Sequence, residues 1–362
     1  MAMTMAMMTP ELGTIEGFYG LPWSWEARAA HVSALAPDGY AFYLYAPKAD
    51  AYLRRRWSEP HPEHEQARLT ELSAHCRNAG VRFGIGLSPY ELYLNFDSAA
   101  RDALGRKLDE LDTIGIDDLA VLFDDMRGDL PGLAEKQIEI IDWIAARTKA
   151  GRLIMCPSYY SDDPLLEHVF GARPDGYLER LGEDLDPAIE IFWTGPRVCS
   201  KNLTPDHLAG IARTLRRKPF IWDNYPVNDG QRMSPFLHLR GFTGREAGIG
   251  REIAAHGVNP ASQPLLSRIP MLTLAALYRG SDPYDAESAF RAAAARVAGP
   301  GLARMIGEDL AVFQDKGLDA LTDKETAALR NRYAAVDHAC AREIMAWLDG
   351  CWRITNEIVQ TQ

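Results

Sequence analysis

The fold is decided by the stretch Asp118-Leu119-Ala120-Val121-Leu122-Phe123-Asp124-Asp125-Met126. In this stretch an apolar run over 119–123 ends in two adjacent carboxylates, Asp124 and Asp125. A short, continuous apolar run is typical of a strand that is buried on both faces of a parallel sheet. Because the carboxyl ends of such strands carry the functional site in parallel α/β folds, we expect the pair at a strand mouth that faces a cleft.

The two carboxylates can serve one site only under a geometric condition. Neighbouring residues of an ideal strand point to opposite faces of the sheet. The strand must therefore have ended, and the backbone must turn at Asp124, if both side chains are to reach the same cleft. A plainer interpretation is a pair that caps the next helix or binds Arg127, and for an isolated Asp-Asp pair we would prefer it. The rest of the chain reverses that preference.

Similar apolar runs recur along the chain and alternate with helical patterns, which favours a parallel sheet. The predicted strands are 12–18, 40–46, 81–87, 119–123, 152–157, 188–193, 219–222 and, more weakly, 253–258. The predicted helices are 25–35, 65–79, 99–114, 133–146, 178–185, 204–216 and 265–278. Eight strands with interleaved helices match an α/β fold of the TIM-like (β/α)8 barrel type, which takes ~250 residues. A doubly wound sheet is the alternative, and the strand count disfavours it.

The sequence changes character after about residue 281. Residues 285–297, 302–315 and 324–352 are rich in Ala, Arg and Glu at helical spacing. We therefore predict a (β/α)8 barrel over residues 9–280 and a helical C-terminal domain over 281–362. The C-terminal helices are either a packing element or a homodimer interface. Segments 161–173 and 224–250 are predicted as loops over the site, the second one punctuated by Gly and Pro.

Composition narrows the classes of function. With 47% hydrophobic and 25% charged residues, the chain has the profile of a globular protein. Its net charge of −11 disfavours a polyanionic partner such as nucleic acid. Five cysteines without close pairs indicate reduced thiols in a cytoplasmic protein. No apolar run approaches membrane-spanning length, and Met1 to Pro10 lack the features of a signal peptide, so no membrane partner is expected.

Carboxylates, amides and aromatic rings recur just after the predicted strands. In chain order the strand ends are followed by Glu16-Gly17-Phe18-Tyr19-Gly20, Ala46-Pro47-Lys48, Asp124-Asp125, Ser158-Tyr159-Tyr160, Trp193-Thr194-Gly195-Pro196, Trp222-Asp223-Asn224, Asn228-Asp229-Gly230 and Asn259-Pro260. The strand ends carry no His/Cys ligand set, no phosphate-binding Gly-rich loop and no Ser-His-Asp order, so we expect neither metal nor cofactor. Singly, Trp222 could be core, Asn259 a turn former and Lys48 a solvated charge. Together they favour a sugar site, which needs carboxylates and amides for hydroxyls and aromatic faces for ring C–H surfaces.

Six segments, in order along the chain, carry a resemblance to a known family. They are Glu16-Gly17-Phe18-Tyr19-Gly20, Tyr45-Ala46-Pro47-Lys48, Phe123-Asp124-Asp125, Trp193-Thr194-Gly195-Pro196, Trp222-Asp223-Asn224 and Asn228-Asp229. With these segments the chain resembles glycoside hydrolase family 84, the O-GlcNAcase and bacterial β-N-acetylglucosaminidase family, over roughly residues 13–278. The resemblance implies a TIM-like barrel, retention of configuration and no metal.

The resemblance also implies roles for the strand-end residues. The substrate's own 2-acetamido oxygen would attack C1, so no protein nucleophile is required. Asp124 would accept the acetamido N–H, and Asp125 would be the general acid and then the general base. Tyr160 and Trp222 would border the acetamido group, and the residues that would hold sugar hydroxyls are Gly17, Lys48, Asn224, Asp229 and Asn259. One departure is Pro157-Ser158-Tyr159-Tyr160, where family members commonly have Thr-Glu-Tyr; alignment favours Tyr160 over Tyr159.

The leading prediction is an exo-β-N-acetylglucosaminidase that acts on O-GlcNAc-bearing proteins or small glycosides. A hyaluronidase-type endo-glycosidase is one alternative, although hyaluronan is a poor electrostatic match for an acidic chain. A non-catalytic sugar-binding barrel is a second. A third is a metal-dependent barrel enzyme in which Asp124 and Asp125 bind Mg²⁺.

Overall fold

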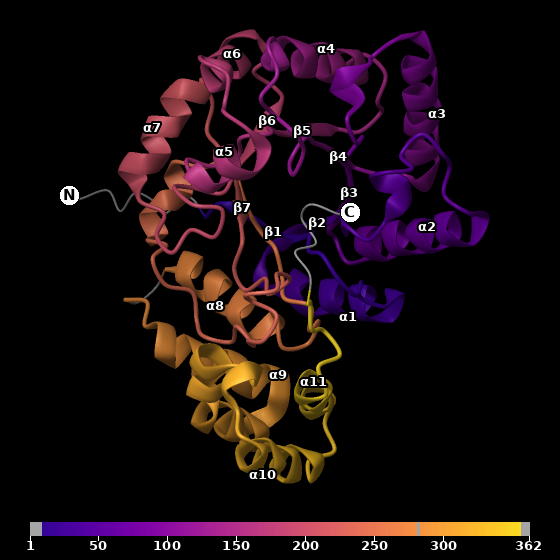
Figure 1. The fold of residues 1–362 in the computed structure, drawn as a ribbon. Helices are drawn as coiled ribbons and strands as arrows, with labels where there is room; N and C mark the ends of the chain where they lie inside the picture. Colours follow the sequence, from indigo (N-terminus) through magenta and orange to yellow (C-terminus); the bar gives the residue numbers. More distant parts are fainter. Residues whose placement is uncertain (1–8, 281–282, 356–362) are drawn as a thin grey trace, which may run out of the picture.

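The computed structural model describes residues 9–280 and 283–355, so most of the Met1 to Pro10 segment lies outside it. Eight parallel strands close into a barrel, each hydrogen-bonded to the next and β8 to β1 (Figure 1). The strands are β1 Glu11–Glu16, β2 Tyr40–Tyr45, β3 Arg82–Leu87, β4 Asp118–Leu122, β5 Arg152–Cys156, β6 Glu190–Trp193, β7 Phe220–Asp223 and β8 Ala255–Val258. The predicted TIM-like (β/α)8 barrel is therefore confirmed.

Helices follow the strands and surround the barrel in Figure 1. They are α1 Trp25–Leu35, α2 Glu63–Asn78, α3 Ser98–Ile114, α4 Leu133–Ala145, α5 Pro164–Phe170, α6 Tyr177–Asp184, α7 Pro205–Leu215 and α8 Arg268–Arg279. The segment 161–173, predicted as a loop, contains α5. This helix begins at an Asp163 cap whose side chain accepts a hydrogen bond from Leu165 N. It is only seven residues long, too short for a periodic apolar pattern to reveal it.

The barrel interior is filled by side chains and is not a channel. The ring centroids of Phe42 and Phe220 lie 5.3 Å apart, and those of Phe220 and Phe192 lie 4.7 Å apart. At Gly13, an added Cβ would lie 2.2 Å from the Phe42 ring, so only glycine fits there. A site for a ligand must therefore lie at one end of the barrel rather than inside it.

Ion pairs close the end of the barrel at which the strands begin. Glu11 pairs with Arg82 at 2.5 Å and with Arg152 at 2.8 Å. Arg82 also pairs with Asp118 at 3.0 Å, and Arg152 pairs with Glu190. These residues stand at or near the start of their strands, so their charges stabilise the lower end and leave the carboxyl ends of the strands for the site.

The C-terminal part is helical and packs on the barrel through α8 (Figure 1). Its helices are α9 Ala286–Glu308, α10 Asp323–Ala334 and α11 Ala339–Leu348, and α9 kinks at Gly299. The run predicted over 324–352 is divided because the His338 side chain accepts from Cys340 N and begins a new helix. One buried cluster contains apolar residues of β1, β7, β8, α8, α9 and α11, so barrel and C-terminal helices share a core.

Candidate active site

Asp124 and Asp125 face one site because the strand ends before them and the backbone then turns. Strand β4 ends at Leu122, and Asp125 takes φ +56°, a left-handed conformation that non-glycine residues rarely adopt. The turn therefore falls at Asp125, one residue later than the sequence suggests. Lys48 Nζ forms an ion pair with Asp124 Oδ2 and lies 3.9 Å from Asp125 Oδ2. Both carboxylates therefore reach the same ammonium group, which meets the geometric condition for one site.

Asp124 is buried, and half of its carboxylate is unused. Its Oδ2 binds Lys48, whereas its Oδ1 has no hydrogen-bond partner within residues 9–280 and 283–355. A buried polar atom without a partner costs ~1–3 kcal/mol, and such atoms are rare in native proteins. Asp124 Oδ1 is therefore ready to accept an N–H or O–H group from a ligand.

Asp125 is held by two tyrosine hydroxyls. Tyr19 donates to Oδ2 at 2.7 Å, and Tyr160 donates to Oδ1 at 3.1 Å. Burial, followed by the charge of Asp125, raises the pKa of both tyrosines well above its ordinary value, so both hydroxyls keep their protons. The adjacent Tyr159 instead donates to Gly171 O at 2.7 Å. Tyr160 is therefore the tyrosine at the pair, as the alignment favoured, whereas sequence reasoning missed Tyr19.

Residues from the ends of β1, β7 and β8 form a second, connected group. Trp222 Nε1 donates to Asn224 Oδ1 at 3.0 Å, and Asn259 Nδ2 donates to the same oxygen at 2.9 Å. Gly17 N donates to Asn259 Oδ1 at 3.3 Å. A Cβ at Gly17 would lie 2.2 Å from Trp222 Cζ2, so only glycine permits this contact. These four predicted site residues are thereby fixed relative to one another.

Tyr19 joins the second group to the carboxylate pair. Its hydroxyl binds Asp125, its backbone N–H donates to Asp229 Oδ2 at 2.8 Å, and it lies two residues from Gly17. Burial raises the pKa of Asp229 to about 6; backbone hydrogen bonds oppose this, and the charge of Asp125 adds to it. The nine predicted site residues therefore lie in two groups of contacts after the strands, and the chain from Gly17 to Tyr19 connects the two groups.

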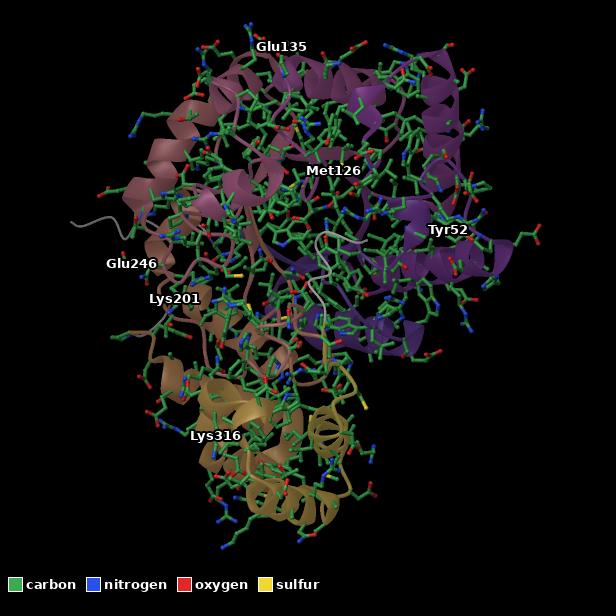
Figure 2. All side chains as sticks on the ribbon, viewed as in Figure 1. Tyr52, Met126, Glu135, Lys201, Glu246 and Lys316 are labelled. Carbon is green, nitrogen blue, oxygen red and sulfur yellow. The ribbon has the colours of Figure 1, made fainter. Side chains whose placement is uncertain are left out.

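The segments after β2 and β3 support the Asp125 turn from outside. Arg54 donates to Asp125 O at 3.2 Å, and Tyr93 donates through its hydroxyl to Arg127 O at 2.6 Å. Met126, between these two carbonyls, lies within the ring of helices in Figure 2. Sequence reasoning assigned no role to Arg54 or Tyr93, because nothing local shows that they contact residues more than thirty positions away.

No group of three or more His, Cys, Asp or Glu side chains that could hold a metal ion occurs within 9–280 and 283–355. In the same part of the chain, no helix is long and apolar enough to cross a membrane.

A closed parallel barrel with one buried and one partly buried carboxylate, amides and a tryptophan at its strand ends is the arrangement of a TIM-barrel glycoside hydrolase. A family model described as beta-N-acetylglucosaminidase matches residues 12–315. The chain therefore belongs to this family, glycoside hydrolase family 84, as the resemblance indicated. The match runs past residue 280 and through α9 to residue 315, and the division into two domains at residue 280 stays a prediction.

Individual relatives agree with the family. Protein O-GlcNAcase of Mus musculus is 29% identical over 279 residues, which cover 74% of this chain, and that of Rattus norvegicus matches equally well. The chain spans about 30% of the length of these curated relatives. Among solved structures, a mutant of the O-GlcNAc hydrolase from Thermobaculum terrenum superposes with a TM-score of 0.78 at 28% identity. This match covers 93% of this chain and 80% of that one.

Proposed function

We propose that this chain is a retaining exo-β-N-acetylglucosaminidase that removes terminal β-linked GlcNAc from proteins or glycosides by substrate-assisted catalysis. The observation that carries the proposal is the unpaired Oδ1 of Asp124, beside a second carboxylate held by two tyrosines. An acetamido N–H is the kind of donor that this buried oxygen lacks. The family match and the similarity to O-GlcNAcases support the substrate class.

In the first step, Asp124 Oδ1 accepts the hydrogen bond of the acetamido N–H and orients the group. The acetamido carbonyl oxygen attacks C1, the bond from C1 to the aglycone oxygen breaks, and Asp125 donates its proton to that oxygen. The product on the sugar is a bicyclic oxazolinium, whose positive charge the Asp124 carboxylate stabilises. No protein atom becomes covalently attached to the sugar.

In the second step, Asp125 removes a proton from water while the water oxygen attacks C1 and the acetamido oxygen leaves. Two displacements at C1 retain the configuration. Tyr19 and Tyr160 suit this double role, because a tyrosine hydroxyl can donate or accept. The two contacts therefore hold Asp125 whether or not it carries the proton.

The burial of the two carboxylates favours hydrolysis of a sugar at the end of a saccharide. The side chains of Asp124 and Asp125 are only 8% and 10% exposed, so a terminal sugar reaches them more readily than an internal one. Asp229 and the linked Asn224 and Asn259 supply acceptors and donors for the hydroxyls of that sugar, and Trp222 presents an aromatic wall.

The test uses an aryl N-acetyl-β-glucosaminide and a thiazoline derived from N-acetylglucosamine, which mimics the bicyclic intermediate. We expect turnover of the aryl glycoside and competitive inhibition at least ~100-fold tighter than N-acetylglucosamine itself, as for analogues of high-energy states. Turnover without tight thiazoline binding would remove the substrate-assisted mechanism. Absence of turnover would leave a sugar-binding barrel, and cleavage restricted to internal linkages of hyaluronan would favour the endo-glycosidase.

A further inference from the structure

The segments that follow β2 and β3 carry a cluster that the proposed reaction does not use. None of the nine site residues comes from the segment after β3, although Tyr93 of this segment binds the backbone carbonyl of Arg127, two residues after the catalytic pair. This segment contains Tyr90, a partly exposed ring. On the preceding segment, Arg54, Arg55 and Arg56 stand side by side in a chain whose net charge is −11.

Two of these arginines approach Tyr90. The Arg55 guanidinium lies 4.1 Å from the ring centroid, and that of Arg54 lies 5.5 Å from it. Arg54 is buried and donates to Asp125 O at 3.2 Å, so the ring and both guanidinium groups lie beside the general acid. Laid end to end, the contacts from Asp125 O to Arg54, from Arg54 to the Tyr90 ring and from the ring to Arg55 have at most the length of about four residues of extended peptide, at roughly 3.3 Å per residue.

Arg55 differs from its neighbour Arg56 in having an unused charge. The Arg55 side chain is exposed and, within residues 9–280 and 283–355, forms no hydrogen bond or ion pair. Arg56 is exposed as well, but it pairs with Glu59 and lies over the ring of Tyr52 (labelled in Figure 2). Stacking on Tyr90 fixes the plane of the Arg55 guanidinium and leaves its N–H edge free for a carboxylate.

Exposed apolar residues occur in segments that follow strands of the barrel. The described residues include three strongly exposed large hydrophobic side chains: Leu21 at 58%, Leu94 at 49% and Leu165 at 51%. They stand after β1, β3 and β5 respectively, the end of the barrel that carries the site. A bulky aglycone with apolar side chains, such as a peptide, fits this surface better than a charged oligosaccharide does.

We propose that Arg55, stacked on Tyr90, forms an aglycone subsite that selects glycopeptides with an Asp or Glu within about four residues of the glycosylated Ser or Thr. The proposal rests on the proposed glycosidase function and names a substrate class for it. In a chain of net charge −11, an acidic peptide is repelled overall, so a local guanidinium group is the element that makes its approach favourable.

The experiment measures one ratio, kcat/KM for a GlcNAc-bearing peptide with Glu near the sugar divided by that for the same peptide with Gln. Glu is scanned over four positions on each side. For the wild-type protein we expect a maximum ratio of about two to five, the size of a single exposed ion pair. Arg55→Gln should bring it close to one, and Arg55→Glu should invert it. High salt should weaken the preference in the wild-type protein.

Arg56→Gln is the matched control, because it removes the same charge from the next residue and should leave the ratio as in the wild type. A wild-type ratio near one at every position would overturn the proposal, as would an equal loss in Arg55→Gln and Arg56→Gln. A preference for phosphoserine without any response to Glu, or for a uronate-bearing saccharide over every peptide, would also overturn it. Wild-type turnover of an aryl glycoside is measured in parallel; its absence would reject the proposed function itself.

Discussion

Asp124, after β4, and Asp223, at the end of β7, occupy similar positions at barrel strand ends and are both buried, at 6% and 2% exposure. Their surroundings differ. Arg245 donates to Asp223 through Nε at 2.8 Å and Nη2 at 2.6 Å, and His256 Nε2 lies 3.0 Å from the same carboxylate. Asp124 has Lys48 at one oxygen and, within the described residues, no partner at the other.

The comparison separates two uses of a buried carboxylate. Burial raises the pKa of Asp223, but the charge of Arg245 and the hydrogen bond from His256 outweigh it and lower the pKa to about 2. Such a group is permanently charged and fully paired, which suits a structural role. A carboxylate with one unpaired oxygen can accept a hydrogen bond from a ligand at that oxygen. Completeness of pairing, rather than burial, distinguishes the two.

The largest effect is expected at Asp124. Asp124→Asn keeps the shape but removes the charge that faces the oxazolinium, and we expect kcat/KM to fall by about 10³-fold on every substrate. The matched control is Asp125→Asn, which should retain most activity on aryl glycosides with good leaving groups, since they need little protonation, and lose about 10²-fold or more on alkyl glycosides. Steady-state kinetics on both substrate types decide the matter. Equal leaving-group dependence in the two variants would contradict the assigned roles.

Asp223 should show the opposite behaviour. Asp223→Asn leaves Arg245 buried beside a neutral partner, which typically costs roughly 3–5 kcal/mol in the free energy of unfolding. Denaturant unfolding measures this loss, and kcat per folded molecule, counted by inhibitor titration, should stay within about threefold of the wild type, because Asp223 is bonded to scaffold residues. A stable but inactive Asp223→Asn would show that this carboxylate belongs to the chemistry.

Much of the barrel could be predicted because parallel strands buried on both faces leave continuous apolar runs, as 119–123 does. The topology then places every strand end at one edge, and the family resemblance selected nine site residues among the strand-end residues without knowledge of their contacts. Short or irregular elements were harder. Helix α5 has too few residues to show periodicity, and the break before α11 depends on His338, an uncommon residue at a helix start.

The contacts within the site could not be predicted, because they join residues far apart in the sequence. Lys48 was expected to hold sugar hydroxyls, and its ion pair with Asp124 spans 76 positions. Tyr19 was quoted only as part of a motif, and its bond to Asp125 spans 106 positions. The direction of a side chain at a strand end depends on a turn such as that at Asp125, which no local pattern in the sequence indicates.

Asp229 is intermediate between the incompletely paired Asp124 and the fully paired Asp223, and its substitution gives the smallest expected effect. Its pKa is raised by burial to about 6, so between pH 3.8 and about 6 the folded protein binds more protons than the unfolded chain, and the contribution of Asp229 to stability decreases as pH rises through this range. After allowance for its partial exposure, the charged form of Asp229 lowers the free energy of unfolding by roughly 1–3 kcal/mol at pH 7. Asp229→Asn should therefore be more stable than the wild type at pH 7 and equally stable near pH 4, as measured by urea unfolding at both values.

The same charge of Asp229 should strengthen sugar binding. The value of 1/KM for the wild type should therefore fall several-fold as pH drops below about 6, and this dependence should be missing from Asp229→Asn. A variant that gains stability at pH 7 but keeps the pH dependence of KM would show that Asp229 is a strained structural carboxylate and does not contact the sugar.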